Sequence, residues 1–489
     1  MICLDLPPSG RLMRTTTLLL TLAACLLVTR NATAADKPNI VVILADDLGY
    51  GDVQRLNPHR GKIKTPHLDK FAAQGMTFTD AHSGSSVCTP TRYGLLTGRY
   101  AWRTRLHSGV LDNYVEPLVA KDRPTLPRLL QEKGYHTACV GKWHLGFTIA
   151  EWGKGDGKKE NLEGAPVGSV TRDGPTTRGF DHFFGFHHAR MMKSVFADDR
   201  VTQLVEPVDM LPLLAKRASA YVADRAKTGM PFFLYLALSS PHTPIVPSKD
   251  WKGRSGLGDY GDFVMETDWA VGEVLASLDK AGVANDTLVV FTSDNGCSPQ
   301  AGTPALEKRG HFASAGFRGY KGDIWDGGHH VPFFVRWPGV VKPDSRSDRL
   351  VCLTDLFATC ADVAGAKVPA AAGEDSVSFL PELLGKPEAG RAAVVHHSIK
   401  GRFAIRDGKW KLCLCAGSGG WSPGGGTESP QLYDMAADPG ETKNLAATRP
   451  EVVTRLTKLL ETFVADGRST PGEKQKNDVD VKIGSIPVL

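Results

Sequence analysis

The hydrophobic positions of the chain form short continuous runs that alternate with longer amphipathic segments. Five runs are apolar at consecutive positions and rich in β-branched or aromatic residues: 39–44, 137–140, 232–238, 287–292 and 331–335. Strands that are apolar on both faces are typical of parallel sheets covered by helices. Between the runs, the pattern indicates helices over 125–133, 211–227, 260–281 and 355–364. The alternation predicts an α/β fold with a mostly parallel sheet flanked by helices.

The pattern changes near residue 390. Short alternating runs over 393–397 and 403–415, the second with a turn at 406–408, predict an antiparallel sheet, and 451–464 predicts a closing helix. We therefore expect a main domain over 35–390 and a smaller C-terminal α+β subdomain over 391–489. The polar stretch 467–482 has no hydrophobic period, and we expect it to be loosely held.

The first 34 residues, 1–34, have the features of a signal peptide. Arg11 and Arg14 precede an apolar run over 18–28, and Ala32-Thr33-Ala34 follows it as a cleavage site. The run is short for a membrane span, and no later segment reaches that length. We expect an exported protein, periplasmic or extracellular, whose mature chain has no transmembrane segment. Leu22-Ala23-Ala24-Cys25 also resembles a lipoprotein box, so lipid anchoring through Cys25 stays open.

Composition narrows the class of protein further. The chain of 489 residues is 42% hydrophobic and 23% charged, which is ordinary for a globular protein. Its net charge of +5 is small for this length and does not indicate nucleic-acid binding. Seven of the nine cysteines follow position 34, so at least one of these is unpaired, and none has the spacing of a structural zinc site. If one is consumed by other chemistry, six remain that could pair in an oxidising compartment, with undetermined connectivity.

Acidic residues follow two of the apolar runs directly. Asp46-Asp47 comes after the first run, and Asp294-Asn295 comes after 287–292. The carboxyl ends of parallel strands meet at one edge of the sheet, so the two acidic tips are expected to converge there. Neighbouring carboxylates repel one another unless a cation lies among them, and such oxygen ligands suit Ca²⁺ or Mg²⁺. One tip alone would be interpreted as a helix or turn cap, whereas two favour a metal site.

The segment Cys88-Thr89-Pro90-Thr91-Arg92 carries the strongest signal. Thr89 suits an N-cap and Pro90 the first helical position, which would put Cys88 at a helix N-terminus, where amide donors favour an anion. Arg92 lies four residues on and would return to the side of Cys88. The alternative is a buried cysteine before a capped helix.

This segment resembles the Cys-x-Pro-x-Arg modification signature of the type I sulfatases, the formylglycine-dependent branch of the alkaline phosphatase superfamily. Leu96-Thr97-Gly98-Arg99 also fits, and further motifs follow in the family's order from about Pro38 to Asn444. The resemblance implies an alkaline-phosphatase-like fold with 35–390 as the catalytic domain. It also implies that a formylglycine-generating or anaerobic maturation enzyme converts Cys88 to Cα-formylglycine during export. One Ca²⁺ would be held by Asp46, Asp47, modified Cys88, Asp294 and Asn295.

By the same likeness, five further residues are catalytic. Arg92, Lys142 and His144 would hold the formylglycine hydrate, and His242 and Lys321 would bind the sulfate or protonate the leaving oxygen. Their local sequences fit, because Lys142 and His144 are two apart after a predicted strand and so share a face. Prolines bracket His242, and glycines surround Lys321. Each residue taken alone has a plainer interpretation as a surface lysine, a core histidine or part of a loop.

The chain also departs from the family pattern. Asp326 stands where relatives commonly have Glu before a Gly-Gly pair, and His329-His330 stands where an apolar residue and Arg are often found. These differences put local packing and substrate choice in question, and not the reaction.

The implied reaction is hydrolysis of a sulfate ester. One hydroxyl of the formylglycine hydrate attacks sulfur and the alcohol departs with a proton; the second hydroxyl then loses its proton, which expels sulfate and restores the aldehyde. Three alternatives stay open. They are an arylsulfatase of broad specificity, a phosphate monoester, diester or phosphonate hydrolase of the same superfamily, and a non-catalytic carbohydrate-binding relative.

Substrate choice in such a fold belongs to the loops around the crevice. Trp421 lies in the glycine-rich segment 416–426, where an exposed indole would stack on a sugar ring. His187, His188 and Arg190 are candidate contacts to hydroxyls or neighbouring sulfates. The alternative is that Trp421 fills its own subdomain. We expect an exo-acting enzyme on a sulfated sugar of a polysaccharide or glycosaminoglycan.

Overall fold

The computed structural model of the chain describes residues 37–149, 164–386, 388, 390–424 and 426–483. The predicted signal peptide and the Cys25 alternative lie outside these ranges. Within them, no helix combines the length and the apolar character that crossing a membrane requires. All seven cysteines in the described ranges are buried and unpaired, so none of the six candidates for pairing forms a disulfide.

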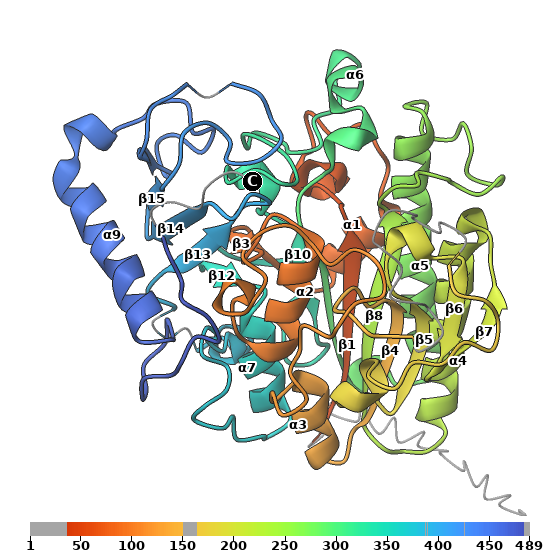
Figure 1. Ribbon diagram of the computed structural model, residues 1–489. Coiled ribbons are helices and arrows are strands. Elements are labelled where there is room, and N and C mark those ends of the chain that lie inside the picture. The colour runs from red at the N-terminus through yellow and green to blue at the C-terminus, as the bar shows by residue number, and fades with distance from the viewer. Residues whose placement is uncertain (1–36, 150–163, 387, 389, 425, 484–489) are drawn as a thin grey trace, which may run out of the picture. The chain divides into compact units, whose positions relative to one another are not determined.

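Ten strands form the main sheet, in the order β11-β2-β10-β9-β1-β8-β4-β5-β6-β7 (Figure 1). The central five are mutually parallel, and they are β9 (Thr287–Ser293), β1 (Asn39–Asp46), β8 (Phe232–Pro241), β4 (His136–Lys142) and β5 (His182–Phe186). The flanking strands are β11 (Ser345–Ser347), β2 (Met76–Phe78), β10 (Phe333–Arg336), β6 (Ser194–Ala197) and β7 (Arg200–Leu204). The predicted α/β sheet is confirmed.

One strand runs opposite to the prediction. The run 331–335 overlaps β10, which pairs antiparallel with β9. After β9 the chain continues from the carboxyl edge of the sheet through the segment 294–332, and it re-enters the sheet from that same edge. The strand is apolar on both faces because helices cover it, so hydrophobicity alone could not give its direction.

Helices cover both faces of the main sheet. On one face lie α1 (Pro66–Ala73), α4 (Pro207–Ala226) and α5 (Asp259–Lys280), and on the other lie α2 (Cys88–Thr97), α3 (Leu126–Glu132) and α7 (Asp355–Val363). Strand β1 shows why both are needed. Val41 and Ile43 belong to the hydrophobic cluster that includes α1, α4 and α5, whereas Ile40 and Val42 belong to the cluster that includes α2, α3 and α7. All four side chains are fully buried. The short helices α6 (Thr303–Lys308) and α8 (Leu380–Leu383), and the paired strands β3 (Ala81–His82) and β12 (Val351–Cys352), complete this part.

The C-terminal residues form the predicted antiparallel sheet. Its strands follow chain order and are β13 (Val394–His397), β14 (Phe403–Asp407), β15 (Trp410–Cys413) and β16 (Gln431–Asp434). Helix α9 (Pro450–Ala465) packs on this sheet through Leu456, Leu460 and Phe463. Figure 1 shows the helix beside the sheet, at the blue end of the chain.

The polar segment after α9 is not loosely held. Arg103 Nη1 donates to Asn477 Oδ1 at 2.9 Å, and the amide of Asp478 donates to the Arg103 carbonyl at 2.8 Å. Arg99 Nη2 lies 3.0 Å from Asp478 Oδ1. Both arginines are buried, so the segment supplies acceptors that their guanidinium groups need. The sequence did not predict this anchoring, because the segment has no hydrophobic period and is held by polar contacts instead.

Candidate active site

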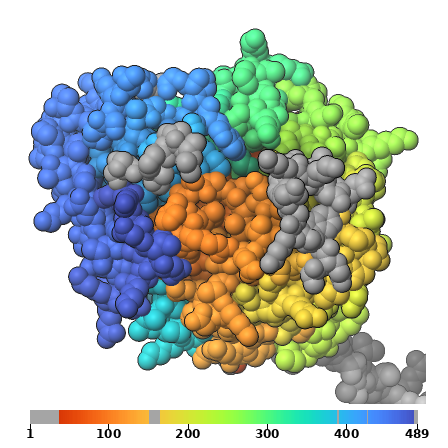
Figure 2. All heavy atoms as spheres, viewed as in Figure 1, coloured from red at the N-terminus to blue at the C-terminus, as the bar shows by residue number. Residues whose placement is uncertain are grey.

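The carboxyl edge of the main sheet collects the polar side chains that the sequence singles out. Asp46 ends β1, Lys142 ends β4, His242 follows β8 and Asp294 follows β9. These strands are parallel, so their ends lie at one edge. Cys88 is the first residue of α2, which covers the sheet near this edge. In Figure 2 the chain near residue 100 (orange) lies at the centre of the visible face, with C-terminal residues (blue) beside it.

Three buried cation–carboxylate pairs form the centre of the site. Lys142 Nζ lies 2.7 Å from Asp46 Oδ2, Arg92 Nη2 lies 2.7 Å from Asp294 Oδ2, and Lys321 Nζ lies 2.6 Å from Asp47 Oδ1. None of these six side chains exposes more than 7% of its surface. The pairs set three cationic side chains against three carboxyl groups in a region that is shielded from water.

The charges also shift the pKa values of two of these carboxyl groups in opposite directions. Burial acts to raise the pKa of Asp46, but Lys142 and the other cations outweigh it and hold that pKa below its ordinary value. Burial, together with the nearby Asp46 carboxylate, raises the pKa of Asp294 to about 7. A further positive charge among carboxyl groups this close would reduce the repulsion between them.

Two oxygen atoms in the centre have no hydrogen-bond partner. They are Asp46 Oδ1 and Asn295 Oδ1, and both are buried. Asn295 uses its Nδ2 to donate to Asp47 Oδ1 at 2.8 Å, which leaves its own oxygen free. Asp46, Cys88 and Asp294 each bring a ligand atom within 4.8 Å of the others. Arg92 Nη2 lies 3.4 Å from Asp46 Oδ1 without a hydrogen bond. Buried oxygens that make no hydrogen bond, among carboxyl groups, fit a hard divalent cation such as Ca²⁺ or Mg²⁺.

Helix α2 begins two residues earlier than predicted. Val87 is its N-cap, with extended backbone, and Cys88 already belongs to the helix. Thr89 was expected to cap the helix, but its hydroxyl instead accepts a hydrogen bond from the amide of Leu111 at 3.2 Å. Cys88 is 2% exposed, and burial raises the pKa of its thiol. Residue 88 therefore lies in the first turn of α2, at the base of the site.

Arg92 holds the centre together. Its Nε and Nη2 both donate to Asp294 Oδ2, and its Nη1 donates to the carbonyl of Lys142 at 3.0 Å. The guanidinium group therefore joins α2 to the ends of β9 and β4. The sequence predicted a cation beside residue 88, and the structure adds that this cation also fixes a carboxylate.

Of the two predicted catalytic histidines, His144 is buried and His242 is partly buried, and they differ in what they contact. His144 has a φ of 55°, and its Nε2 lies 2.8 Å from the carbonyl of Leu111, where it donates. Its Nδ1 is then an acceptor, and that atom is buried without a partner. His242 Nε2 lies 3.7 Å from Asp47 Oδ2. Burial and the Lys321 cation lower the pKa of His242 to about 4.

The four candidate substrate residues lie in different surroundings. His187 has no exposed surface and packs against Tyr114 and Phe147. His188 is 5% exposed, and its ring lies 4.5 Å from that of His144. Arg190 is half exposed, 3.9 Å from Asp112. Trp421 is 49% exposed, so it does not fill the interior of its subdomain. Arg190 and Trp421 thus offer surface that a substrate could touch, whereas His187 and His188 are buried.

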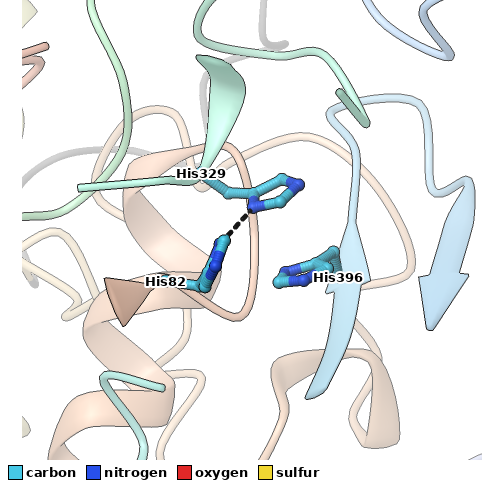
Figure 3. A group of neighbouring side chains, drawn as sticks. All are labelled: His82, His329 and His396. Atoms are coloured by element: carbon cyan, nitrogen blue, oxygen red, sulfur yellow. Dashed lines mark hydrogen bonds between the residues drawn. The ribbon is translucent and has the colours of Figure 1, made fainter. Parts of the chain in front are cut away.

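The residues that depart from the family pattern lie away from this centre, in a buried cluster of histidines. Figure 3 shows His82, His329 and His396 together, from β3, the turn before β10 and β13. The Nδ1 atoms of His82 and His329 are 3.1 Å apart, and the rings of His329 and His396 stack at 3.7 Å. Asp326 Oδ1 accepts from Lys411 of β15 at 2.7 Å. Asp326 and His329 therefore join the antiparallel sheet to β3 and to the segment before β10.

Comparison with known proteins decides the family. Residues 38–366 match the family described as Sulfatase. The chain belongs to the sulfatase family. Residues 320–466 also match the family described as N-sulphoglucosamine sulphohydrolase, C-terminal. The fold is that of the alkaline-phosphatase-like sulfatases, as predicted, and the protein is a sulfatase.

Curated relatives and a solved structure cover most of the chain. The N-acetylgalactosamine-6-O-sulfatase of Bacteroides thetaiotaomicron is 31% identical to this sulfatase, over 88% of this chain and 94% of that protein. Arylsulfatase A of Homo sapiens is 32% identical, over 90% and 89%. A sulfatase structure from work on the metabolism of multiple glycosaminoglycans by Bacteroides thetaiotaomicron aligns with a TM-score of 0.76 at 30% identity, covering 88% of this chain and 99% of that one.

Two contributors to the site were not recognised from the sequence. The carbonyl of Leu111 fixes the donor side of His144, and no side-chain pattern signals a backbone acceptor. Asp323 lies in the glycine-rich stretch around Lys321, where its buried carboxylate accepts three backbone hydrogen bonds. A buried aspartate between glycines is a signal for such a role, since Asp commonly binds nearby amides in turns.

Proposed function

We propose that this sulfatase hydrolyses a sulfate ester of a carbohydrate, with a Cα-formylglycine nucleophile made from Cys88 and one bound Ca²⁺. The observation that carries the proposal is the position of Cys88 in the first turn of α2, beside three buried cation–carboxylate pairs. A thiol at that point is a weak nucleophile, because burial raises its pKa. Its oxidation to an aldehyde hydrate would supply a hydroxyl instead.

The proposed calcium ligands are Asp46, Asp47, residue 88, Asp294 and Asn295. Support comes from the two buried oxygens of Asp46 and Asn295 that lack a donor. When bound, the cation would lower the pKa of a hydroxyl on residue 88 and offset the charge of the sulfate group. Since the protein's own charges already balance in the centre, the ion would add net positive charge where the anionic sulfate has to bind.

Each of the other polar residues has a proposed task. Arg92 fixes Asp294 and the end of β4, which keeps the ligands in place. His144 Nδ1, an acceptor without a partner, would accept a hydrogen bond from a hydroxyl of residue 88. Lys142 and Lys321 supply positive charge for the sulfate oxygens. His242 or Lys321 gives a proton to the departing alcohol, which leaves as the S–O bond to the sugar breaks.

A sulfated saccharide is the proposed substrate, from a polysaccharide or glycosaminoglycan. The relative at 31% identity acts on N-acetylgalactosamine 6-O-sulfate groups by its name, and the similar structure comes from glycosaminoglycan metabolism. The half-exposed indole of Trp421 offers a stacking surface for a sugar ring. Arg190 and His188 would contact hydroxyls or a second sulfate, with His187 supporting them from behind.

Exo-action belongs to the same proposal, and the burial of the reacting residues supports it. Cys88 is 2% exposed and Lys321 is 6% exposed, so little of either side chain is open to solvent. The terminal unit of a saccharide needs access from one direction only, whereas an internal unit carries chain on both sides.

An arylsulfatase of broad specificity is the second candidate, because arylsulfatase A is 32% identical over most of the chain. A phosphate monoester, diester or phosphonate hydrolase is the third, since the same charges would suit a phosphoryl group. Rates on matched sulfated saccharides, aryl sulfates and phosphate esters separate the three.

The proposal also covers the export of the protein, its maturation and its domain boundaries. The chain would be exported, to the periplasm or beyond, after removal of 1–34 or lipidation of Cys25. A formylglycine-generating or anaerobic maturation enzyme would act on Cys88 before folding, because the folded protein buries that thiol. The boundaries 35–390 for the catalytic domain and 391–489 for the C-terminal subdomain belong to the same proposal.

The test is the variant Cys88→Ala, co-expressed with a maturation enzyme and compared with the wild type. We expect turnover of sulfated saccharides to fall to background while the fold and the melting temperature stay close to the wild type. Sulfatase activity near the wild-type level in this variant would exclude residue 88 as the nucleophile.

A further inference from the structure

We propose that Asp323 is a positioning residue that couples the Lys321 turn to the Trp421 loop. The coupling keeps the saccharide-binding indole at a fixed position relative to the residues that attack the sulfate. The inference rests on the proposed carbohydrate substrate and adds a specificity-determining residue to it.

Asp323 joins two segments that are far apart in the sequence. Its Oδ2 accepts from the amide of Tyr320 at 2.9 Å, which closes the turn that contains Lys321. Its Oδ1 accepts from the amides of Trp421 and Ser422 at 2.9 and 3.0 Å. The side chain is fully buried, so these three amides depend on it for a partner.

The two segments approach closely because glycines face each other. A Cβ on Gly420 would lie 2.2 Å from the carbonyl oxygen of Gly322, and a Cβ on Gly322 would lie 2.8 Å from the Trp421 ring. The indole therefore lies over the backbone of Gly322, the residue next to Lys321. Backbone contact at this distance leaves the loop little freedom to shift along the turn.

The same glycine is tied to the segment that precedes Cys88. The amide of Gly322 donates to the carbonyl of Ser86 at 2.9 Å, and its carbonyl accepts from the amide of Ile399 at 3.1 Å. Four segments thus meet at Gly322, and three of them carry residue 88, Lys321 and Trp421. A sugar stacked on the exposed indole would have its orientation fixed relative to the reacting groups, which is the condition for fast transfer.

Two variants test the coupling by different physical routes. Asp323→Asn keeps the side-chain volume but replaces one carboxylate oxygen with an NH₂ group. That group faces an N–H donor, either of Tyr320 or of Trp421 and Ser422, so the carboxamide cannot accept hydrogen bonds from both segments. Gly420→Ala keeps the Asp323 carboxylate but places a Cβ 2.2 Å from the Gly322 carbonyl oxygen and 2.6 Å from Asp323 Oδ1, so it forces the loop away from both by steric contact. Asp434→Asn is the control. Asp434 lies in the same subdomain and accepts from the amides of Ala436 and Ala437, but it does not contact this loop.

The first readout is hydrogen exchange of the amides of Trp421 and Ser422, which needs no substrate. Both variants should lose protection there, whereas Asp434→Asn should not. Wild-type protection of these amides in Asp323→Asn and in Gly420→Ala would overturn the coupling, whatever the substrate is. If the wild type hydrolyses no sulfated saccharide, the proposed function fails, and the exchange result still decides whether Asp323 positions the loop.

The second readout is the ratio of kcat/KM on a sulfated saccharide to kcat/KM on a small aryl sulfate. We expect both variants to lower this ratio about tenfold, mainly through KM on the saccharide, because the loss of one stacked contact is of that size. In the double variant Asp323→Asn/Trp421→Ala, the two effects should not add, since Asp323 acts through Trp421. Additive effects, or an equal loss on both substrates, would contradict the proposal.

Discussion

Lys142 Nζ lies 2.7 Å from Asp46 Oδ2, and neither side chain has any exposed surface. The two residues come from β4 and β1, which are separated in the sheet by β8. The pair therefore joins strands that share no backbone hydrogen bonds, at the edge where the proposed nucleophile lies. Removing one partner of a buried pair leaves the other charge unpaired, which typically costs about 3–5 kcal/mol.

Asp46→Asn should lower both calcium retention and stability. The variant removes a charged ligand and leaves Lys142 without its carboxylate, so bound calcium should fall and the stabilisation by added calcium should shrink. Metal analysis after dialysis and thermal unfolding with and without calcium measure the two effects. Asp355→Asn is the matched control, because Asp355 is buried and paired with Arg391 outside the site.

The control should lose stability but keep its calcium. Unchanged calcium content in Asp46→Asn, together with full activity in a strong chelator, would contradict the proposed ligand set.

Lys411→Met should destabilise the protein without changing its preference among substrates. Lys411 Nζ lies 2.7 Å from Asp326 and 2.8 Å from Glu441, and all three side chains are buried. The change leaves two carboxylates unpaired, so we expect a loss of about 3–5 kcal/mol in the free energy of unfolding. Chemical denaturation measures it. A loss below about 1 kcal/mol would show that the pairing adds little to the junction between the two sheets.

Stability should fall as the pH drops below about 6.5, the ordinary pKa of an unfolded histidine. Burial and the neighbouring His330 lower the pKa of His82 to about 4, and burial and His329 lower the pKa of His396. Between these values the unfolded chain binds protons that the folded chain does not, so acid favours unfolding. Above about pH 6.5 these histidines do not make the free energy of unfolding depend on pH.

His82→Gln removes one of these groups and should lose less stability over the same window. Urea unfolding at several pH values between 7.5 and 4.5 measures how the free energy of unfolding changes with pH. His59 is exposed, so His59→Gln provides the control. Equal slopes for His82→Gln and the wild type would mean that His82 is protonated in the folded protein.

Trp421→Ala should weaken saccharide turnover more than aryl sulfate turnover. Loss of a stacked indole should raise KM for a sulfated oligosaccharide about tenfold, while an aryl sulfate that does not reach the loop should be affected less. A panel of sulfated monosaccharides and oligosaccharides beside one aryl sulfate measures this. If both activities are unchanged, or if the wild type hydrolyses only the aryl ester, the carbohydrate assignment through this loop is wrong.

The sequence predicts the site as far as local patterns reach. Asp46 and Asp294 were found because each directly follows an apolar strand, and parallel strands end at one edge. The direction of β10 was wrong because a buried strand is apolar whichever way it runs. The contact of Trp421 with Gly322 could not be predicted, since it depends on how two glycine-rich loops pack, and glycines leave no side-chain pattern. The meeting of His82 with His396 likewise depends on tertiary packing.

Mass spectrometry of the peptide that contains residue 88 tests the central claim most directly. The enzyme is prepared with and without a maturation enzyme, and the fraction of modified peptide is compared with the specific activity of each preparation. The account predicts that the thiol of Cys88 is replaced by an aldehyde and that activity rises in proportion to the modified fraction. Full sulfatase activity in a preparation whose residue 88 is entirely unmodified cysteine would contradict it.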